Sequence, residues 1–147
     1  MDIRSERMTI QEQLMDIRDA DAEIETLRLS MFDAWLQATR ITAELDGISV
    51  QSTPEPHKYD TIAILDSAIG DRLRRLNAQR ARAIELIGDA PTSLQRQVLM
   101  AYYVDCRAAD GRRKTWDMVA AQLHLSARQA QRVASDAITA LEVQRCR

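Results

Sequence analysis

Apolar side chains recur at alternating spacings of three and four residues along much of the N-terminal third of the chain. This pattern is typical of a coiled-coil seam. Thr9-Ile10-Gln11-Glu12 has the form of a capping box, in which a hydroxyl and a carboxylate satisfy each other's backbone amides. A long helix is therefore predicted from Thr9 to Gly47. Its seam residues are Ile10, Leu14, Ile17, Ala20, Ile24, Leu27, Met31, Ala34, Ala38, Ile41 and Leu45.

A second long helix is predicted from about Asp60 to Ile87, with Gly88 as its end. Residues 47–58 between the two helices are predicted to form a loop, because Pro54 and Pro56 lack the backbone donors that a helix requires. The two helices are long enough to pair antiparallel. We interpret residues 1–88 as a coiled-coil-like helical hairpin. The apolar side of its second helix consists of Ile62, Leu65, Ile69, Leu73, Leu76, Ala83 and Ile87.

A second apolar stripe lies on the face of the first helix opposite the seam. It comprises Leu29, Phe32 and Leu36, and Trp35 widens it. A two-helix hairpin buries only one of these faces. We expect the stripe to contact another subunit, in a homo-oligomer and preferably a dimer. Docking of the C-terminal half on the same stripe is the competing explanation.

The composition favours an all-α fold. The chain has only three prolines and four glycines among 147 residues, and no segment alternates apolar and polar positions over a strand's length. No apolar run is long enough for a membrane span, and no signal-peptide core follows Met1, so a cytoplasmic location is expected. Cys106 and Cys146 are too few and too distant for a metal site, even with His57 and His124. We expect free thiols, no bound metal and no cofactor.

The C-terminal part, residues 89–147, has short helices with separate caps. Thr92 or Ser93 begins one, with Leu94, Val98, Leu99 and Tyr102 as its buried face, and the loop "DCRAADGRRK" follows. Thr115 begins a second helix. A second capping box, Ser126-Ala127-Arg128-Gln129, restarts the chain after a tight turn. This order predicts a helix-turn-helix, whose inward side in the last helix is Ala130, Val133, Ala137 and Leu141.

The outward side of the last predicted helix, 127–142, suits the major groove of double-stranded DNA. Arg binds guanine and Gln binds adenine through paired hydrogen bonds, and a capped helix start suits a phosphate. Charge supports this: residues 90–147 hold 9 Lys and Arg against 5 Asp and Glu (+4), whereas residues 1–89 hold 11 against 17 (−6). The predicted base-reading residues are Arg128, Gln129, Gln131, Arg132 and Ser135. The predicted phosphate contacts are Arg112, Arg113, Lys114, Thr115 and Ser126.

The stretches "SLQRQVLMAYYV" and "TWDMVAAQLHLSARQAQRVASDAITAL" resemble region four of sigma factors. The arrangement is most similar to phage regulators of the ArpU and RinA type, in which a region-four-like domain follows a charged hairpin. The resemblance implies that residues 127–135 form the recognition helix, with Arg128, Gln131 and Arg132 reading bases. It also implies regulation beside RNA polymerase, a candidate partner. The chain departs from the pattern at His124, where glycine is usual, and in its longer 104–114 loop.

The leading hypothesis is thus a sequence-specific transcriptional regulator encoded by a phage or prophage. One alternative is the DNA-recognition subunit of a packaging terminase, a small terminase, which also joins a helix-turn-helix to an oligomerising helical element. Another is a helical interaction protein that does not bind DNA. An enzyme is not expected, because the sequence has no Ser-His-Asp or Cys-His set, no phosphate-binding glycine loop and no metal-ligand cluster.

Overall fold

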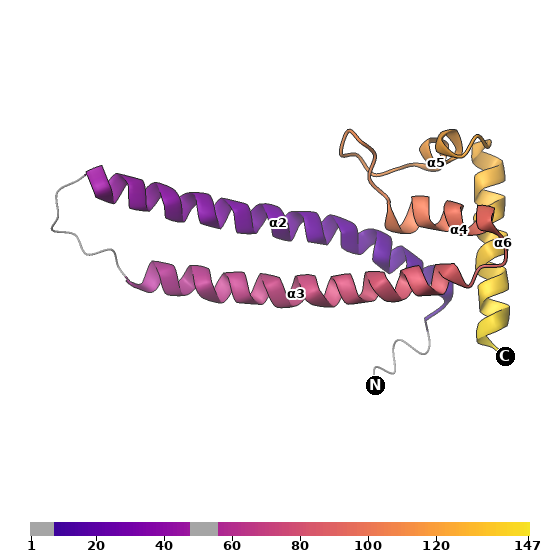
Figure 1. Cartoon of the computed structure of the whole chain (residues 1–147), viewed down its shortest axis with the longest axis horizontal. Coiled ribbons are helices and arrows are strands. Elements are labelled where there is room, and N and C mark those ends of the chain that lie inside the picture. Colours follow the sequence, from indigo (N-terminus) through magenta and orange to yellow (C-terminus); the bar gives the residue numbers. More distant parts are fainter. Residues whose placement is uncertain (1–7, 48–55) are drawn as a thin grey trace. The chain divides into compact units, whose positions relative to one another are not determined.

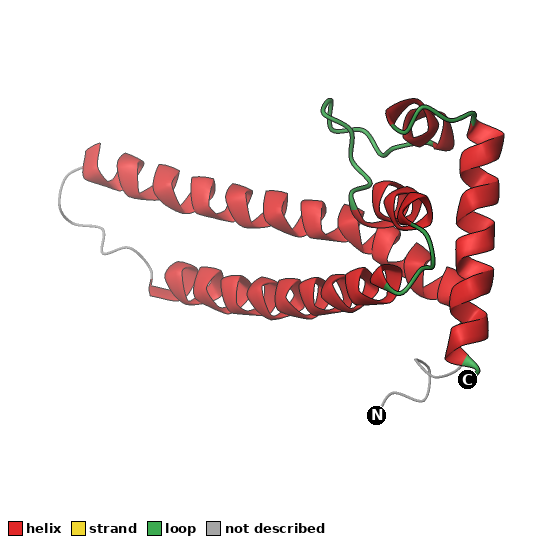
Figure 2. Ribbon diagram, turned by 45° about the vertical axis from the view of Figure 1, so that its right-hand side comes forward, coloured by secondary structure: helices red, strands yellow, loops and turns green. Residues whose placement is uncertain are grey.

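The computed structural model describes residues 8–47 and 56–147, including their side chains except at 38, 40–47 and 56–62. The regular elements of these residues are all helical, which confirms the predicted all-α class (Figure 2). The described part contains one isolated β-bridge, between Arg107 and Arg113. The helices are α2 (Ile10–Gly47), α3 (Pro56–Gly88), α4 (Ser93–Leu99), the π-helix η1 (Met100–Val104), α5 (Trp116–Gln122) and α6 (Ala127–Arg145) (Figure 1).

The starts of the two long helices follow from local chemistry. Thr9 Oγ1 accepts a hydrogen bond from Glu12 N (3.1 Å), and Thr9 N donates to Glu12 Oε2 (3.0 Å), so the predicted capping box begins α2. α3 begins at Pro56, earlier than predicted. Proline is well suited to the first helical position, where its missing N–H would have had no partner and its φ is already helical. Residues 56–58 are therefore helix rather than loop, and 48–55 lie outside the described residues.

The chain divides into two compact units, and the division differs from the predicted one at residue 88. Unit 1 combines Met1–Asp21 with Ala78–Arg147, and unit 2 is Ala22–Asn77. The start of α2 and the end of α3 therefore belong with the C-terminal helices. The predicted boundary was wrong because the apolar pattern of a continuous helix gives no sign of where its packing partner changes.

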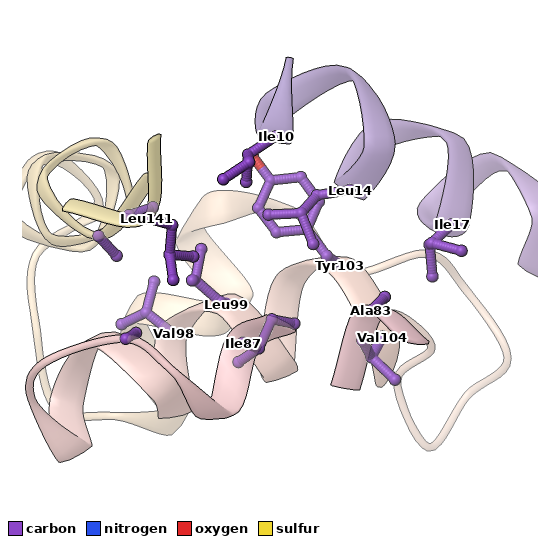
Figure 3. Close-up of a cluster of buried hydrophobic side chains, with 13 residues drawn as sticks. Ile10, Leu14, Ile17, Ala83, Ile87, Val98, Leu99, Tyr103, Val104 and Leu141 are labelled. Atoms are coloured by element: carbon purple, nitrogen blue, oxygen red, sulfur yellow. The ribbon is translucent and has the colours of Figure 1, made fainter. Parts of the chain in front are cut away.

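The core of unit 1 explains this division. Ile10 and Leu14 of α2 are fully buried, and they pack in one cluster with Leu99 of α4, Tyr103 of η1 and Leu141 of α6 (Figure 3). The end of α3 adds further side chains. The other buried members are Ile17, Ala83, Ile87, Ala90, Val98, Val104, Ala134 and Ala137. The first part of the predicted coiled-coil seam therefore completes a globular core.

Unit 2 is the helical hairpin proper. Within it α2 and α3 run antiparallel, side by side (Figure 1), and an ion pair joins Arg72 Nε to Glu23 Oε1 at 2.8 Å. Ile24, Ile69 and Leu76 are buried. The predicted seam residues Leu27, Met31, Ala34 and Leu73 are half-buried, Leu65 is exposed, and Ala38, Ile41, Leu45 and Ile62 lie outside the described side chains.

The segment that follows Thr92 does not bury all of the residues predicted for its inner face, because it ends in a π-helix. Val98 and Leu99 are buried as predicted, but Leu94 is 38 % exposed and Tyr102 is half-buried. A π-helical turn holds more residues than an α-helical turn, so it rotates the residues that follow it. Tyr103 consequently enters the core, and Tyr102 contacts α5 instead.

Candidate nucleic-acid interface

The helix-turn-helix consists of α5, a tight turn and α6, and α6 packs against both α4 and α5. Thr115 caps α5, and its Oγ1 accepts a hydrogen bond from Met118 N (3.3 Å). Val119 and Ala120 are buried, and the small Ala120 also accepts a hydrogen bond from Leu125 N (2.8 Å) through its carbonyl oxygen. That bond closes the turn between the two helices.

The turn requires one residue in the left-handed conformation. His124 has φ of 58° and is the only non-glycine residue with positive φ in the described segments. This conformation crowds Cβ against the backbone, so a residue without Cβ would adopt it at a lower cost. Ser126 then caps α6: its Oγ accepts from Gln129 N (3.1 Å), and Gln129 Oε1 accepts from Ser126 N (2.9 Å). The predicted capping box is present.

The outer face of α6 carries a group of polar side chains that have no internal role. Arg128, Gln131, Arg132 and Ser135 are exposed, whereas Ala130, Ala134, Ala137 and Leu141 on the other side are buried. Val133, predicted as core, is half-buried, and Ala134 was missed. Within the described part of the chain, neither arginine makes an ion pair or a side-chain hydrogen bond. Both guanidinium groups are free to bind a ligand.

The capping residues are less available than this outer face. Gln129, predicted to read bases, uses Oε1 in the cap of α6, so its amide nitrogen is the group that the cap leaves unengaged. The hydroxyl oxygens of Ser126 and Thr115 accept backbone hydrogen bonds at their caps. Both residues are exposed, and each hydroxyl keeps its proton to donate to a phosphate.

The basic cluster before α5 is largely paired with carboxylates. Arg112 Nε lies 3.2 Å from Asp110, and Arg113 Nη2 lies 3.1 Å from Asp19 of α2. Both side chains are on the surface, so a phosphate could compete for them. Lys114 does not match its predicted role as a phosphate contact. It is only 8 % exposed, and its Nζ lies 3.4 Å from Asp105, because the loop folds it inward.

The long 105–114 loop is itself ordered by backbone contacts. Ala108 N donates to Arg112 O (2.8 Å), and Gly111 N donates to Ala108 O (2.9 Å). Gly111 takes φ of 86°, which a residue with Cβ adopts only with strain. Arg107 Nε also lies 2.6 Å from Asp21 of α2. The loop is thus a small turn fixed on α2 rather than a free basic arm.

Arg18, which sequence reasoning missed, holds this arrangement together. It is 8 % exposed, and it donates from Nη1 to Tyr102 O and from Nη2 to Lys114 O, both at 2.6 Å. Its guanidinium lies 3.9 Å from the Tyr102 ring centroid, and that ring stacks on Trp116, the first residue of α5, at 3.7 Å. Arg18 therefore fixes the start of the helix-turn-helix. One arginine in a charged helix gives no sign of this role.

Cys106 is the most buried group of the loop. Burial raises the pKa of its thiol, and the charge and hydrogen bond of Asp21 raise it further. A raised pKa makes the thiol a poor nucleophile at neutral pH. Cys146 is exposed, and both cysteines are free. Among the described residues, no three His, Cys, Asp or Glu side chains gather as a candidate metal site. No helix in that part has both the length and the apolar character of a membrane span.

The predicted partner surface lies in unit 2. Leu29, Phe32, Trp35 and Leu36 are between 48 and 60 % exposed, so α3, the other helix of this unit, does not cover them. The alternative, docking of the C-terminal half on this stripe, stays a prediction.

Comparison with known proteins identifies no relative of the chain. The chain matches no protein-family model, no curated protein and no solved structure.

Proposed function

We propose that the chain is a sequence-specific DNA-binding transcriptional regulator that inserts the start of α6 into the major groove. The observation that carries the proposal is the outer face of α6, where Arg128 and Arg132 are exposed and unpaired beside Gln131. Guanidinium and amide groups form the paired hydrogen bonds that distinguish guanine and adenine in the major groove. Recognition helices read DNA with residues in their N-terminal part.

Charge distribution within unit 1 supports assigning the reading role to α6. The basic residues of the 105–114 loop face carboxylates of Asp19, Asp21, Asp105 and Asp110. The two arginines of α6 make no ion pair among the described side chains. A phosphate or a base edge gains more from a guanidinium that has no competing partner. The loop arginines Arg112 and Arg113 are secondary phosphate contacts in this proposal.

The resemblance to region four of sigma factors extends the proposal to promoter DNA and to a phage or prophage regulator that acts beside RNA polymerase. The resemblance is to region four alone, so we propose regulation beside a sigma factor rather than replacement of one. Its role is to direct or block polymerase at a site that it reads itself.

The test is fluorescence anisotropy on the DNA flanking the gene and on a random duplex, across salt concentrations. The matched variants are Arg128→Ala with Arg132→Ala, and Arg75→Ala with Arg82→Ala, a pair of exposed arginines on α3 that changes the charge equally. We expect tighter binding to the native DNA, a steep decrease with salt and loss of preference only in the α6 variant. Equal loss in both variants would indicate binding by charge alone.

An absence of binding to either DNA at low salt, with and without polymerase, would contradict the proposal and favour an interaction protein. A mass corresponding to eight or more subunits would instead favour the small-terminase alternative.

A further inference from the structure

The exposed apolar stripe of α2 in unit 2 is too regular to be a set of scattered surface residues. Leu29 is 57 % exposed, Phe32 60 % and Leu36 48 %, and they are spaced by three and four residues along one side of the helix. Trp35 is 53 % exposed at its edge. Ile24, on another side of the same helix, is 4 % exposed. Contiguous large apolar side chains on a surface indicate a contact with another molecule.

The charges beside the stripe specify how a partner helix would lie. In heptad terms Leu29 and Leu36 are a positions and Phe32 is a d position, which makes Arg28 a g position and Asp33 an e position. Arg28 and Asp33 are both exposed, and neither has an ion pair among the described side chains. They lie on opposite edges of the stripe.

A second copy of this helix complements these edges when it runs parallel. In a parallel coiled coil, a g residue faces the e residue that lies five positions further along the other helix. Arg28 and Asp33 are five positions apart, so each Arg28 would face Asp33 of the other copy, twice per dimer. An antiparallel pair places like edges together, so Arg28 would not meet Asp33. The charges at the edges of the stripe therefore favour a parallel pair of α2 helices over an antiparallel one.

We propose that two copies of the chain associate through α2, parallel and in register, with Leu29, Phe32 and Leu36 in the interface and Arg28–Asp33 pairs at both edges. The stripe from Leu29 to Leu36 spans little more than one heptad, so it would bury far less than the roughly 1,600 Å² of a standard interface. We therefore expect a weak dimer. The proposal does not depend on DNA binding, and a monomer that reads DNA would contradict only this inference.

Disulfide cross-linking of the full chain tests the direction. Leu29→Cys and Leu36→Cys are made separately with Cys146→Ser, while buried Cys106 is kept, and Gln37→Cys is the control at an exposed position away from the stripe. We expect both stripe variants to form disulfide-linked dimers and the control to remain monomeric. The two positions are about 10 Å apart along the helix, so an antiparallel pair can bring only one of them to its two-fold axis.

Cross-linking of one stripe variant alone, of neither, or of the control to the same extent would overturn the proposal. Neither variant cross-linking would indicate that the stripe binds a different protein.

Charge exchange provides a second test that leaves the apolar residues intact. Arg28→Asp and Asp33→Arg each replace two attractions with two repulsions, so we expect each to weaken the dimer roughly tenfold in sedimentation equilibrium. An equimolar mixture of the two variants restores both pairs and should return to wild-type affinity. Circular dichroism checks that each variant keeps its helix. Failure of the mixture to recover would overturn the parallel arrangement.

Discussion

At the scale of single residues, Arg18 shows how a charge can lie in the interior of a small helical unit. Its guanidinium is satisfied by two backbone carbonyls and by the face of Tyr102, so its burial does not leave donors without partners. The carbonyls belong to Tyr102 and Lys114, which lie at the two ends of the 105–114 loop region. One side chain therefore ties α2 to both η1 and the start of α5.

Replacement of Arg18 by Met should lower the free energy of unfolding by about 3 kcal/mol, because two buried carbonyls lose charged donors while the apolar stem remains. Urea unfolding followed by circular dichroism measures the change. Arg82→Met, at an exposed position on α3, is the matched control and should change stability by less than about 0.5 kcal/mol. Equal effects of the two substitutions would show that Arg18 has no special structural role.

The Cys106 thiol should make stability depend on pH in the alkaline range. Its pKa is raised in the folded chain from the ordinary 9.0, so above that pH the unfolded chain releases the proton while the folded chain retains it. Stability is then complete below pH 9 and decreases as pH rises. We expect urea midpoints to decrease as the pH rises above about 9, and Cys106→Ala to reduce this decrease. Cys146→Ala, at an exposed thiol, should leave it unchanged; an unchanged slope in Cys106→Ala would contradict the assignment.

At the scale of elements, the local signals in the sequence predicted the helix starts well. Thr9 and Ser126 begin α2 and α6 with the capping boxes that their sequences predict, since each box depends on residues only three positions apart. The same reasoning could not predict η1 or the inward turn of Lys114. Lys114 is held by Asp105 beside its Nζ and by Arg18 of α2 at its carbonyl oxygen, and no local pattern encodes these contacts.

The candidate reading face was also predictable, because helical periodicity is a local property of the sequence. The outward placement of Arg128, Gln131 and Arg132 follows from helical periodicity once the buried side of α6 is known. The engagement of Gln129 follows from the predicted capping box. The pairing of Lys114 with Asp105 was not predictable, because it depends on how the loop folds.

The turn between α5 and α6 offers a test of backbone strain. His124 takes φ of 58°, so glycine should fit this position better, and His124→Gly should stabilise the protein by about 0.5–1 kcal/mol even after the extra entropy of the unfolded chain. Thermal unfolding measures the change. His124→Val is the opposing variant and should destabilise, because a β-branched residue tolerates this conformation poorly. Destabilisation by glycine would mean that the exposed imidazole makes a contact that outweighs the strain.

At the scale of the whole molecule, the compact units of the folded chain do not coincide with the two domains that the sequence pattern predicts. The segment that sequence patterns define as a DNA-binding domain, residues 89–147, contains only part of its own core. Ile10, Leu14 and Ile17 of α2 and Ala83 and Ile87 of α3 cover the same cluster that Leu99 and Leu141 contribute to. The hydrophobic burial that stabilises α4 to α6 is thus shared with the end of α3 and with the start of α2, which lies more than 70 residues before α4 in the chain.

The isolated segment 89–147 should therefore fail to fold cooperatively, because it would expose Val98, Leu99 and Leu141, which are nearly fully buried in the complete chain. Heat-induced unfolding and the dispersion of amide signals in NMR spectra measure this. The control keeps unit 1 and replaces residues 28–67 with a short glycine-rich loop. A short loop can join residues 27 and 68 because the nearby Glu23–Arg72 ion pair shows that α2 and α3 lie side by side there. The shortened chain should retain a cooperative transition. A sharp transition in the isolated segment would instead show that the start of α2 is dispensable for the helix-turn-helix.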